Sequence, residues 1–325
     1  MIHCALCIND RDGNYFIYPH TVVISILHNA SRPVCFHIIA DETLGLERRK
    51  ILEDLAGAQG GKVIFYTAPQ VSEEVEACIR NGLGVGAIYR LFLHEVVACD
   101  KLLYLDCDIS VNMDLAELYD IELGEHYLAA VEEPNLTYSD KFHGLRGFSK
   151  LPDRYFNSGV LLMNLRKFRD LCAERNILLD AFVEHDDTRV FNDQDVLNGV
   201  LASIDGSVMF IDEKYNYMIN TSGRMLESLQ ELRGKIIHYI RTKPLATFYP
   251  AALLFWKYCP LGDGRARTEV FEAMEQIPTR KEILYCRDAL YTRKSAATFR
   301  RYYDLHKHGL LWFIKKRLFP KKYKR

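Results

Sequence analysis

Short apolar runs alternate with helix-spaced apolar positions along the first third of the chain. Continuous apolar runs of this kind are typical of buried strands, and apolar residues three or four apart are typical of helices packed on a sheet. The alternation predicts βαβ units and an α/β fold. We expect strands at Ile2–Ile8, Val34–Ala40, Lys62–Tyr66 and Leu102–Leu105, and helices at Pro19–Asn29, Leu46–Leu55 and Val85–Cys99.

The alternation continues less regularly through the middle of the chain. Residues Pro134–Asp153, rich in Gly, Ser, Lys and Arg, predict a long loop, and long loops in compact domains tend to be functional. Past Pro244 the pattern is helical, with many aromatic and charged residues and no clear strand. The middle strands are expected at Tyr127–Val131, Phe156–Asn164, Val208–Ile211 and Lys235–Ile240, and the helices at Leu165–Glu184 and Asp193–Ser203.

Length and composition fit one large α/β domain with a helical appendage. The chain has 325 residues, of which 49% are hydrophobic and 26% charged, as in ordinary soluble proteins. Met1 leads into an apolar strand without the basic region of a secretory signal, and no apolar run approaches the ~20 residues that cross a bilayer. The nine cysteines are irregularly spaced, and Cys4 and Cys7 lie inside the first strand. We therefore expect a reduced, cytosolic protein.

The C-terminal segment is strongly basic. Residues 311–325 contain seven Lys or Arg and no acidic residue, and because the whole chain has a net charge of −1, residues 1–310 carry −8. Apolar side chains lie among these cations, a combination typical of a helix in a membrane interface. We expect this tail to bind an anionic membrane surface; the alternative is a solvated, frayed C-terminus. Nucleic acid is not an expected partner, because the basic residues are confined to one end of an acidic protein.

The apolar run Leu102–Leu105 ends in Asp106-Cys107-Asp108. In an extended backbone residues two apart point to the same side, so the two carboxylates should converge beyond the carboxyl end of a strand, where open α/β sheets bind ligands. The Cys107 side chain would point to the opposite face. A pair of carboxylates suits Mn²⁺ or Mg²⁺, with open positions left for a phosphate. The alternative is a polar loop in which one aspartate caps the next helix.

A second polar motif opens the strand at Phe156–Asn164. Gly159 lets a ligand or another backbone approach closely, and Asn157 offers a donor and an acceptor to a hydroxyl-rich ligand. The alternative is a bulge at the start of the strand.

Two further motifs follow downstream. Asp193 is a natural N-cap for the helix beginning there, but capping does not explain Gln194 or so dense a polar cluster. His238, at the end of an apolar strand, could complete a metal site with the two aspartates, and Lys243 lies just beyond it. A histidine on a strand is otherwise more often a satisfied core residue.

Taken in order, these motifs closely resemble those of family-8 retaining glycosyltransferases, which include bacterial lipopolysaccharide galactosyl- and glucosyltransferases and glycogenin. The resemblance covers residues 1–245 and implies a GT-A-type mixed sheet flanked by helices, with Mn²⁺ (or Mg²⁺) and a UDP-sugar donor. Residues 246–325 are then a helical extension with the basic tail at its end. The resemblance is carried by Asn14-Tyr15, Arg90, Leu103–Asp108, Tyr155–Leu165, Asp193–Gly199 and His238–Pro244.

By motif position, the resemblance implies a role for each matching residue. Asp106, Asp108 and His238 would be the metal ligands. Gln194 and Asp193 would be the catalytic pair at the reacting sugar, and Glu132 would lie near the acceptor. The implied donor-binding residues are Asn9 or Asp10 with Asn14 and Tyr15 for uracil and ribose, Asp106 and Cys107 in the metal-binding segment, Arg90, Asn157 and Ser158 around the sugar, and Lys243 at the diphosphate.

The sequence departs from the family pattern in three places. The first loop, Asn9–Gly13, is longer than usual, which leaves open which acid faces uracil. The interval from His238 to Lys243 is one residue short, and Arg241-Thr242 replaces the usual glycine. A leucine, Leu245, stands where tryptophan often follows the proline. These changes concern the phosphate contacts and not the metal site.

The expected reaction is retaining transfer of glucose or galactose from a UDP-sugar to a hydroxyl of a glycan or glycolipid, on the inner face of the cell membrane. The resemblance puts Gln194 near the far face of the sugar, and because an amide is a poor nucleophile, same-face attack is expected. Two alternatives stay open: an inactive module that binds nucleotide sugars or glycans, and a haloacid-dehalogenase-like phosphatase. In the latter, Asp-x-Asp would follow the first strand, whereas here it follows the fourth.

Overall fold

The structure, a computed structural model, describes residues 1–11, 13–79, 85–133, 145–186, 191–220, 222–225, 227, 229–240, 243–245 and 251–260. The chain forms two compact units. Met1–Met218 and Gly234–His238 make the first, and the second comprises Ile219–Arg233 and the residues from Tyr239 onward. The expected boundary at residue 245 stays a prediction, and the basic tail lies outside the described residues.

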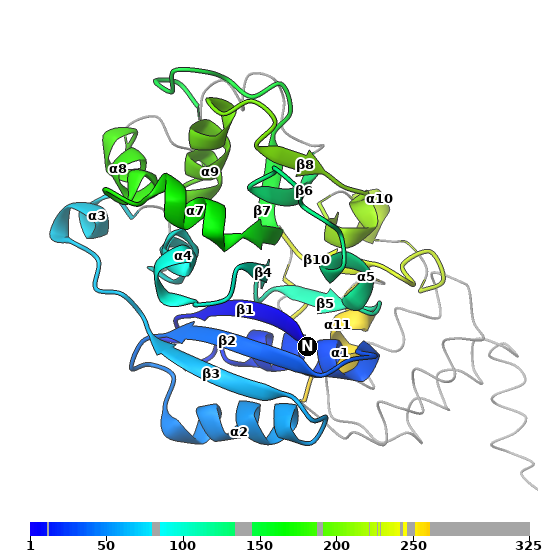
Figure 1. Ribbon diagram of the computed structural model, residues 1–325. Coiled ribbons are helices and arrows are strands. Elements are labelled where there is room, and N and C mark those ends of the chain that lie inside the picture. Colours follow the sequence, from blue (N-terminus) through cyan, green and yellow to red (C-terminus); the bar gives the residue numbers. More distant parts are fainter. Residues whose placement is uncertain are drawn as a thin grey trace, which may run out of the picture. The chain divides into compact units, whose positions relative to one another are not determined.

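A mixed seven-stranded sheet, in the order β3-β2-β1-β4-β7-β6-β8, forms the centre of the first unit (Figure 1). β7 is antiparallel to both neighbours, and the other six strands run in one direction. The predicted α/β class is confirmed. The strands are β1 (Ile2–Ile8), β2 (Val34–Ala40), β3 (Lys62–Thr67), β4 (Lys101–Leu105), β6 (Leu128–Glu132), β7 (Phe156–Asn164) and β8 (Val208–Phe210).

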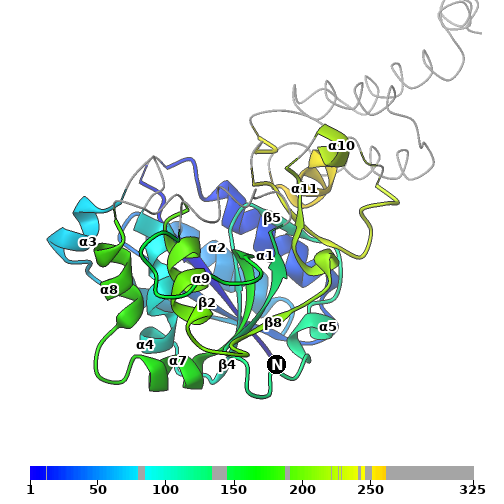
Figure 2. The ribbon, with the colours of Figure 1, turned by 90° about the horizontal axis from the view of Figure 1, so that it is seen from above.

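Helices cover the sheet on both faces (Figures 1 and 2). α1 (Ile17–Asn29) and α2 (Leu46–Gly57) pack together on one face, and the other layer lies on the opposite face. That layer comprises η1 (Val85–Phe92), α4 (Leu93–Val96), α7 (Leu165–Leu171), α8 (Ile177–Glu184) and α9 (Asp193–Ala202). The shorter helices are α3 (Glu73–Ala77), α5 (Ala116–Tyr119) and η2 (Glu213–Asn216), and the second unit contains α10 (Ser222–Met225) and α11 (Ala252–Tyr258).

A small second sheet completes the first unit. Its strands are β5 (Ile109–Val111), β10 (Ile236–His238) and β9 (Tyr217–Met218), in the order β5-β10-β9. The antiparallel register pairs His238 with Ile109. Since Ile109 directly follows Asp108, this pairing brings the end of β10 to the Asp-Cys-Asp segment.

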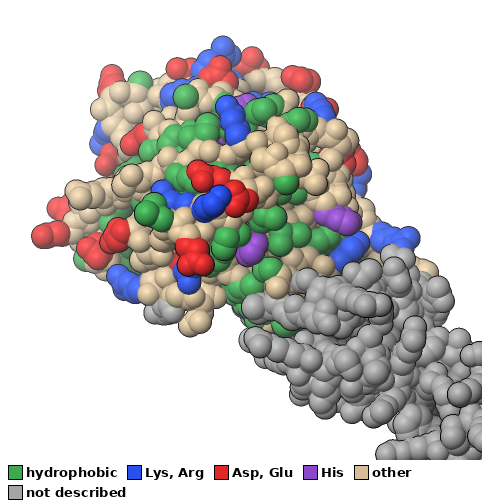
Figure 3. Space-filling model, turned by 90° about the horizontal axis from the view of Figure 1, so that it is seen from below, with side chains coloured by type: hydrophobic (Ala, Val, Ile, Leu, Met, Phe, Trp, Pro, Cys, Tyr) green, Lys and Arg blue, Asp and Glu red, His purple; other side chains and the backbone are tan. Residues whose placement is uncertain are grey.

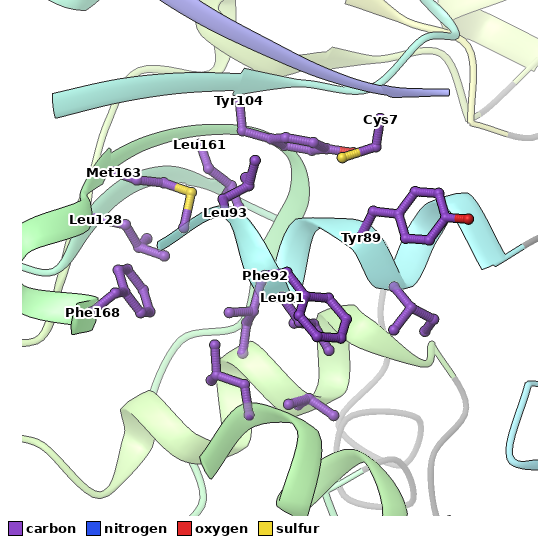
Figure 4. Packing of buried hydrophobic residues seen from close by; sticks show 14 of the residues in the cluster. Cys7, Tyr89, Leu91, Phe92, Leu93, Tyr104, Leu128, Leu161, Met163 and Phe168 are labelled. Atoms are coloured by element: carbon purple, nitrogen blue, oxygen red, sulfur yellow. The ribbon is translucent and has the colours of Figure 1, made fainter. Parts of the chain in front are cut away.

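The core on the η1 and α4 face is made of large side chains from the sheet and the helical layer. Tyr104 and Leu161 of the sheet lie beside Leu93 of α4 (Figure 4), and all three are at most 2% exposed. Burying each such side chain stabilises the fold by roughly 1.5–3 kcal/mol. The buried Tyr104 side chain therefore anchors the carboxyl end of β4, just before Asp106.

Two predicted helices differ from the observed elements. The segment expected to be helical from Val85 to Cys99 is a 3₁₀ helix over Val85–Phe92 followed by one α-helical turn. The helix expected over Leu165–Glu184 is broken between α7 and α8, because Asn176 accepts hydrogen bonds from the backbone N–H groups of Leu178 and Leu179, at 3.1 and 3.2 Å, and so begins a new helix. β5, β9, α3 and α5 were not predicted, since they are too short to show a period.

The surface of the first unit carries charges of both signs. On the face shown in Figure 3, acidic and basic side chains are interspersed with apolar ones. The Lys50–Asp54 pair of α2, 2.8 Å apart, is an exposed example, and such pairs contribute at most about 1 kcal/mol. Within the part of the chain that the structure describes, no helix combines the length and apolar character needed to cross a membrane.

The strand order creates a switch point between β1 and β4. The chain adds β2 and β3 on one side of β1 and then returns to the other side with β4. The carboxyl ends of β1 and β4 therefore meet at one edge of the sheet, where open α/β sheets bind ligands. Antiparallel β7 starts at this same edge, and the Asp106 N–H donates to the Gly159 carbonyl at 2.8 Å.

Candidate active site

Asp106, Asp108 and His238 converge at the switch-point edge. One ligand atom from each lies within 4.8 Å of the others. His238 Nε2 is 3.4 Å from Asp108 Oδ1 and 3.7 Å from Asp106 Oδ2. Ligands about 2.0–2.2 Å from a divalent ion lie roughly 3 Å apart, so only a small contraction would be needed to bind one.

The two oxygens of Asp106 have different surroundings. Oδ1 accepts hydrogen bonds from Arg90 Nη2 at 2.8 Å and from the Tyr104 hydroxyl at 2.7 Å. Oδ2 faces His238. The protein thus holds one oxygen and leaves the other directed to the cluster, as a monodentate metal ligand requires. Two neighbouring carboxylates and an imidazole form an O,O,N donor set that suits Mn²⁺ or Mg²⁺.

A chain of hydrogen bonds determines the tautomer of His238. The Gly159 backbone N–H, which can only donate, is 2.9 Å from Asn157 Oδ1. Asn216 Nδ2 donates to the same oxygen at 2.8 Å, so Asn216 Oδ1 must accept from His238 Nδ1 at 2.9 Å. The proton is therefore on Nδ1, and the lone pair of Nε2 points toward the aspartates, as in metal sites whose histidines are oriented by a second ligand shell.

Gly159 provides the space in which this cluster fits. A Cβ atom at this position would lie 2.2 Å from His238 Cε1 and 2.9 Å from Asp106 Oδ2. The sequence predicts a close approach at Gly159, and the approaching groups include the side chains of two proposed metal ligands. Taken with the donor set, this steric requirement indicates that the residues present fit a divalent cation.

Arg90 connects the cluster of Asp106, Asp108 and His238 to the start of α9. Its side chain is 7% exposed and stacks on the Tyr104 ring, 4.6 Å from the centroid. Nε lies 3.0 Å from Asp193 Oδ2, and Nη1 donates to the Ser158 carbonyl at 2.8 Å. Burial raises the pKa of Asp193 to about 6, although Arg90 acts in the opposite direction. A single guanidinium thus compensates the buried Asp193 and the partly buried Asp106.

The polar start of α9 is a hydrogen-bonded network and not a simple cap. Gln194 Oε1 accepts from the Ser158 N–H at 2.9 Å, and Gln194 Nε2 donates to the Tyr155 hydroxyl at 3.3 Å. That hydroxyl donates to Asp195 Oδ1 at 2.6 Å. The expectation that Asp193 is the N-cap was wrong: Asn192 occupies the cap, with φ of 44°, and the Asp193 carboxylate bonds to Ser158 and Arg90 instead.

The first loop, Asn9–Gly13, is held in place by contacts with neighbouring segments. Asp10 is buried, accepts from the Tyr15 N–H at 2.6 Å, and pairs with Arg48, while Asn9 donates to Asp41. Asn14 is exposed. The Cys107 thiol hydrogen-bonds the Tyr15 hydroxyl and donates to the Cys7 carbonyl at 3.5 Å; that it points away from the proposed metal ligands stays a prediction.

Two charged residues, Glu132 and Lys243, complete the set of predicted site residues. Glu132 is paired with Arg154 at 2.8 Å, whereas its neighbour Glu133 is buried and accepts from Asn157 Nδ2 at 3.0 Å. Lys243 belongs to the second unit, where its Nζ donates to the Tyr239 carbonyl at 2.9 Å. The switch-point edge therefore gathers Arg90, Asp106, Asp108, Asn157, Ser158, Asp193, Gln194 and His238.

Sequence reasoning missed Tyr104, Glu133 and Asn216. Tyr104 is two residues before Asp106, so strand alternation could have placed its hydroxyl on the same side. Glu133 directly follows Glu132 at the end of β6. Because neighbouring residues of a strand point to opposite faces, the two carboxylates could have been expected to differ, one directed to the site and one to the outside. Asn216 lies in η2 and carries no local signal, since its partners come from β7 and β10.

Comparison with known proteins gives a consistent family assignment. Residues 3–245 match the profile of glycosyl transferase family 8. Glycosyltransferase GlyF of Streptococcus pneumoniae is 28% identical over 262 residues, 76% of this chain and 59% of GlyF. The lipopolysaccharide 1,3-galactosyltransferase of Salmonella typhimurium is 27% identical over 259 residues, 73% of this chain and 74% of that protein. The chain spans about three fifths of the length of the first relatives it matches.

A solved structure shares the fold. The crystal structure of the galactosyltransferase LgtC, in complex with donor and acceptor sugar analogues, matches with a TM-score of 0.60 at 24% identity. The match covers 85% of this chain and 98% of LgtC. It confirms the expected fold of the GT-A type.

Proposed function

The chain belongs to glycosyl transferase family 8, and on this basis we propose that it is a metal-dependent enzyme that transfers glucose or galactose from a UDP-sugar to a hydroxyl of a glycan or glycolipid. The observation that carries the proposal is the cluster of Asp106, Asp108 and His238 at the switch-point edge, with Arg90 and Asp193 beside it. A cation-binding group next to buried hydrogen-bonding side chains is what a sugar diphosphate requires.

Asp106, Asp108 and His238 would hold Mn²⁺ or Mg²⁺. The bound ion would act as a Lewis acid that stabilises the charge developing on the departing diphosphate, an effect worth several kcal/mol. Arg90 keeps Asp106 oriented through its 2.8 Å contact. Asn157, Ser158 and Asp193 offer the donors and acceptors that would orient the donor sugar.

We assign the departing phosphate oxygen, and not a side chain, as the acceptor of the proton from the incoming hydroxyl. Both ends of the Gln194 amide are hydrogen-bonded to the protein, at Ser158 and at Tyr155, so Gln194 would act as a fixed dipole near the anomeric carbon. This arrangement supports same-face attack with retention of configuration. A covalent glycosyl adduct on Asp193, detected by mass spectrometry of the enzyme during turnover, would contradict it.

The remaining donor and acceptor contacts are proposals of the same kind. Asn9 or Asp10, with Asn14, Tyr15 and Cys107, would form the uridine site, and Lys243 would bind the diphosphate. Glu132 would contact the acceptor. Its partner Arg154 lines a cavity of about 220 Å³ that also borders Phe156 and Phe210, and the Arg154 guanidinium stacks on the Phe210 ring, 3.9 Å from the centroid.

The test is UDP release by the full chain with Mn²⁺ and a panel of UDP-sugars, with and without glycan acceptors. We expect release with one hexose donor, and loss of release both in Asp108→Asn and after chelation. Far-ultraviolet circular dichroism would show that this variant is folded. UDP-sugar binding without release would favour an inactive binding module, and phosphate release from simple esters would favour a phosphatase; either result would overturn the proposal.

We also propose that residues 311–325 bind anionic membranes and so hold the enzyme at the inner face of the cell membrane. The support is compositional: seven cations among apolar and aromatic residues, each cation near an anionic surface being worth about 1 kcal/mol. Full-length protein should pellet with phosphatidylglycerol vesicles better than a chain ending at Gly309. Equal pelleting of the two would contradict this.

A further inference from the structure

A second group of possible metal ligands lies at the opposite edge of the sheet. His3 is at the amino end of β1, and Cys99 lies in the turn before β4. One ligand atom from each of His3, His37 and Cys99 falls within 4.8 Å of the others. Because β1 and β4 run parallel, their amino ends are separated from the switch-point edge by the length of the strands, about 3.3 Å per residue.

The register of the sheet explains why these side chains meet. β1 and β2 are paired with His3 opposite Cys35, so His37 lies two residues further along β2 on the same face. His3 Nδ1 is 2.9 Å from His37 Nε2, and Cys35 Sγ is 3.6 Å from the same His37 nitrogen. Two imidazoles and two thiols thus come from three neighbouring strands or their ends.

We propose that His3, His37 and Cys99 form a second metal site, for a borderline-soft divalent ion of the Zn²⁺ type. Imidazole nitrogen and thiolate sulfur are the ligands that Zn²⁺ and Co²⁺ prefer, whereas Mn²⁺ and Mg²⁺ prefer oxygen. The site therefore differs in selectivity from the Asp106 cluster. A water molecule would be the fourth ligand.

The geometry requires only a small adjustment. Two nitrogens each ~2.1 Å from a tetrahedral ion lie ~3.4 Å apart, so the two rings must separate by about half an ångström. The ion would replace the proton shared by His3 and His37. The Tyr66 hydroxyl, 2.9 Å from His37 Nδ1, orients the ring as outer-shell partners do in known sites.

The neutral imidazoles and the exposure of the cluster suit a metal, whereas the Cys99 thiol must lose its proton to bind one. Burial lowers the pKa of His37 to about 4 and also lowers that of His3, so both imidazoles are neutral near pH 7. Burial raises the pKa of the Cys99 thiol to about 11, so binding would release its proton. His3 and Cys99 are partly exposed, which gives an ion a route to the buried His37.

Co²⁺ spectroscopy separates this site from the first one. The full-length Asp108→Asn variant, in which the active-site cluster is disabled, would be titrated with Co²⁺. We expect one equivalent to produce visible bands of tetrahedral Co²⁺ and a near-ultraviolet band from thiolate coordination, both abolished by excess Zn²⁺. Adding Cys99→Ser should abolish the thiolate band, and adding His3→Gln should weaken binding roughly tenfold or more.

Cys172→Ser is the matched control, because Cys172 is also partly exposed but lies outside the cluster; it should keep the band. Zn²⁺ should raise the melting temperature of Asp108→Asn but not that of the double variant with Cys99→Ser. If Cys99→Ser does not fold, Cys99→Ala replaces it. Absence of the thiolate band, or its persistence without Cys99, would overturn the proposal. Since Asp108→Asn is used throughout, neither result depends on glycosyl transfer.

Discussion

Gly159 is the single residue whose size decides whether the proposed metal ligands can meet. Its backbone N–H orients Asn157, its carbonyl accepts from Asp106 N–H, and the space where a Cβ would lie is filled by His238. The residue therefore contributes through its backbone groups and through the absence of a side chain. Both contributions act on the same ligand cluster.

Replacing Gly159 with alanine should move His238 away from Asp106, because the new Cβ would lie 2.2 Å from His238 Cε1. We expect Mn²⁺ affinity, measured by isothermal titration calorimetry, to fall roughly tenfold or more, and overpacking to cost about 1–3 kcal/mol in the free energy of unfolding. Gly57→Ala in α2 is the control, since no atom of the described residues lies within 4 Å of its Cβ position. Wild-type Mn²⁺ affinity in Gly159→Ala would show that the cluster is not the metal site.

Asn216 acts on the same cluster from outside it. Asn216→Leu keeps a similar volume but removes the acceptor for His238 Nδ1, so we expect Mn²⁺ affinity to fall ~10–100-fold. Asn216→Asp retains an acceptor there and should bind Mn²⁺ more tightly than the leucine variant. Electron paramagnetic resonance of free Mn²⁺ would measure both affinities. Equal affinities in the two variants would argue against the tautomer explanation.

At the scale of elements, α9 is held to β7 by polar side chains at its start. Tyr155 and Asp195 bond at 2.6 Å with both side chains buried, and Asn198 bonds both the N–H and the carbonyl of Phe156. The helix begins at Asn192 with a positive φ of 44°, the one non-glycine residue in the described ranges with such a value. This conformation directs the first turn of α9, with Asp193 and Gln194, toward Ser158.

Because of this positive φ, we expect position 192 to favour glycine over other residues that lack the asparagine side chain. Asn192→Gly and Asn192→Ala both remove the side chain, but only glycine adopts this φ without strain. We expect the glycine variant to be more stable than the alanine variant by about 1–2 kcal/mol. Urea denaturation would measure the difference, and equal midpoints would show that the helix start relaxes.

At the scale of the whole molecule, buried histidines couple stability to pH. Burial lowers the pKa values of His37 and His94 to about 4, against 6.5 when unfolded. The unfolded chain therefore binds more protons between these values, and the stability from these two groups is present above pH 6.5 and lost as the pH falls toward 4. Asp193, with its pKa raised to about 6, opposes this loss, because its folded form is favoured by protonation.

His94→Leu tests one of these groups alone. His94 Nε2 is buried and has no hydrogen-bond partner among the residues that the structure describes; Glu95 Oε1 is 3.6 Å away, and Arg169 adds to the lowering of the His94 pKa. We expect the free energy of unfolding of the variant to be no lower than wild type at neutral pH and to fall less steeply between pH 6.5 and 4. Chemical denaturation across that range would measure the slope. An unchanged slope would mean that His94 does not titrate differently on folding.

Several features followed from the sequence because they depend on neighbouring residues. The apolar runs predicted β1, β2, β4 and β7, since a strand buried on both faces needs continuous hydrophobicity whatever lies beside it. The two-residue spacing of Asp106 and Asp108 likewise predicted their convergence. The order of the polar motifs along the chain was enough to indicate the glycosyltransferase family. Each of these inferences uses contacts or spacings within a short stretch of chain.

The tertiary structure decided what depends on distant segments. The pairing of β10 with β5 brings His238 to Asp108, 130 positions earlier, and Asn216 then orients its ring. Arg90 pairs with Asp193 and Asp106 because η1 packs against both β1 and α9. No local pattern encodes these pairings, since hydrogen bonds and ion pairs depend on angstrom-scale positions that only the packed sheet and helices determine. The sequence thus determined which residue types are available for the chemistry, and the fold determined which of them act together.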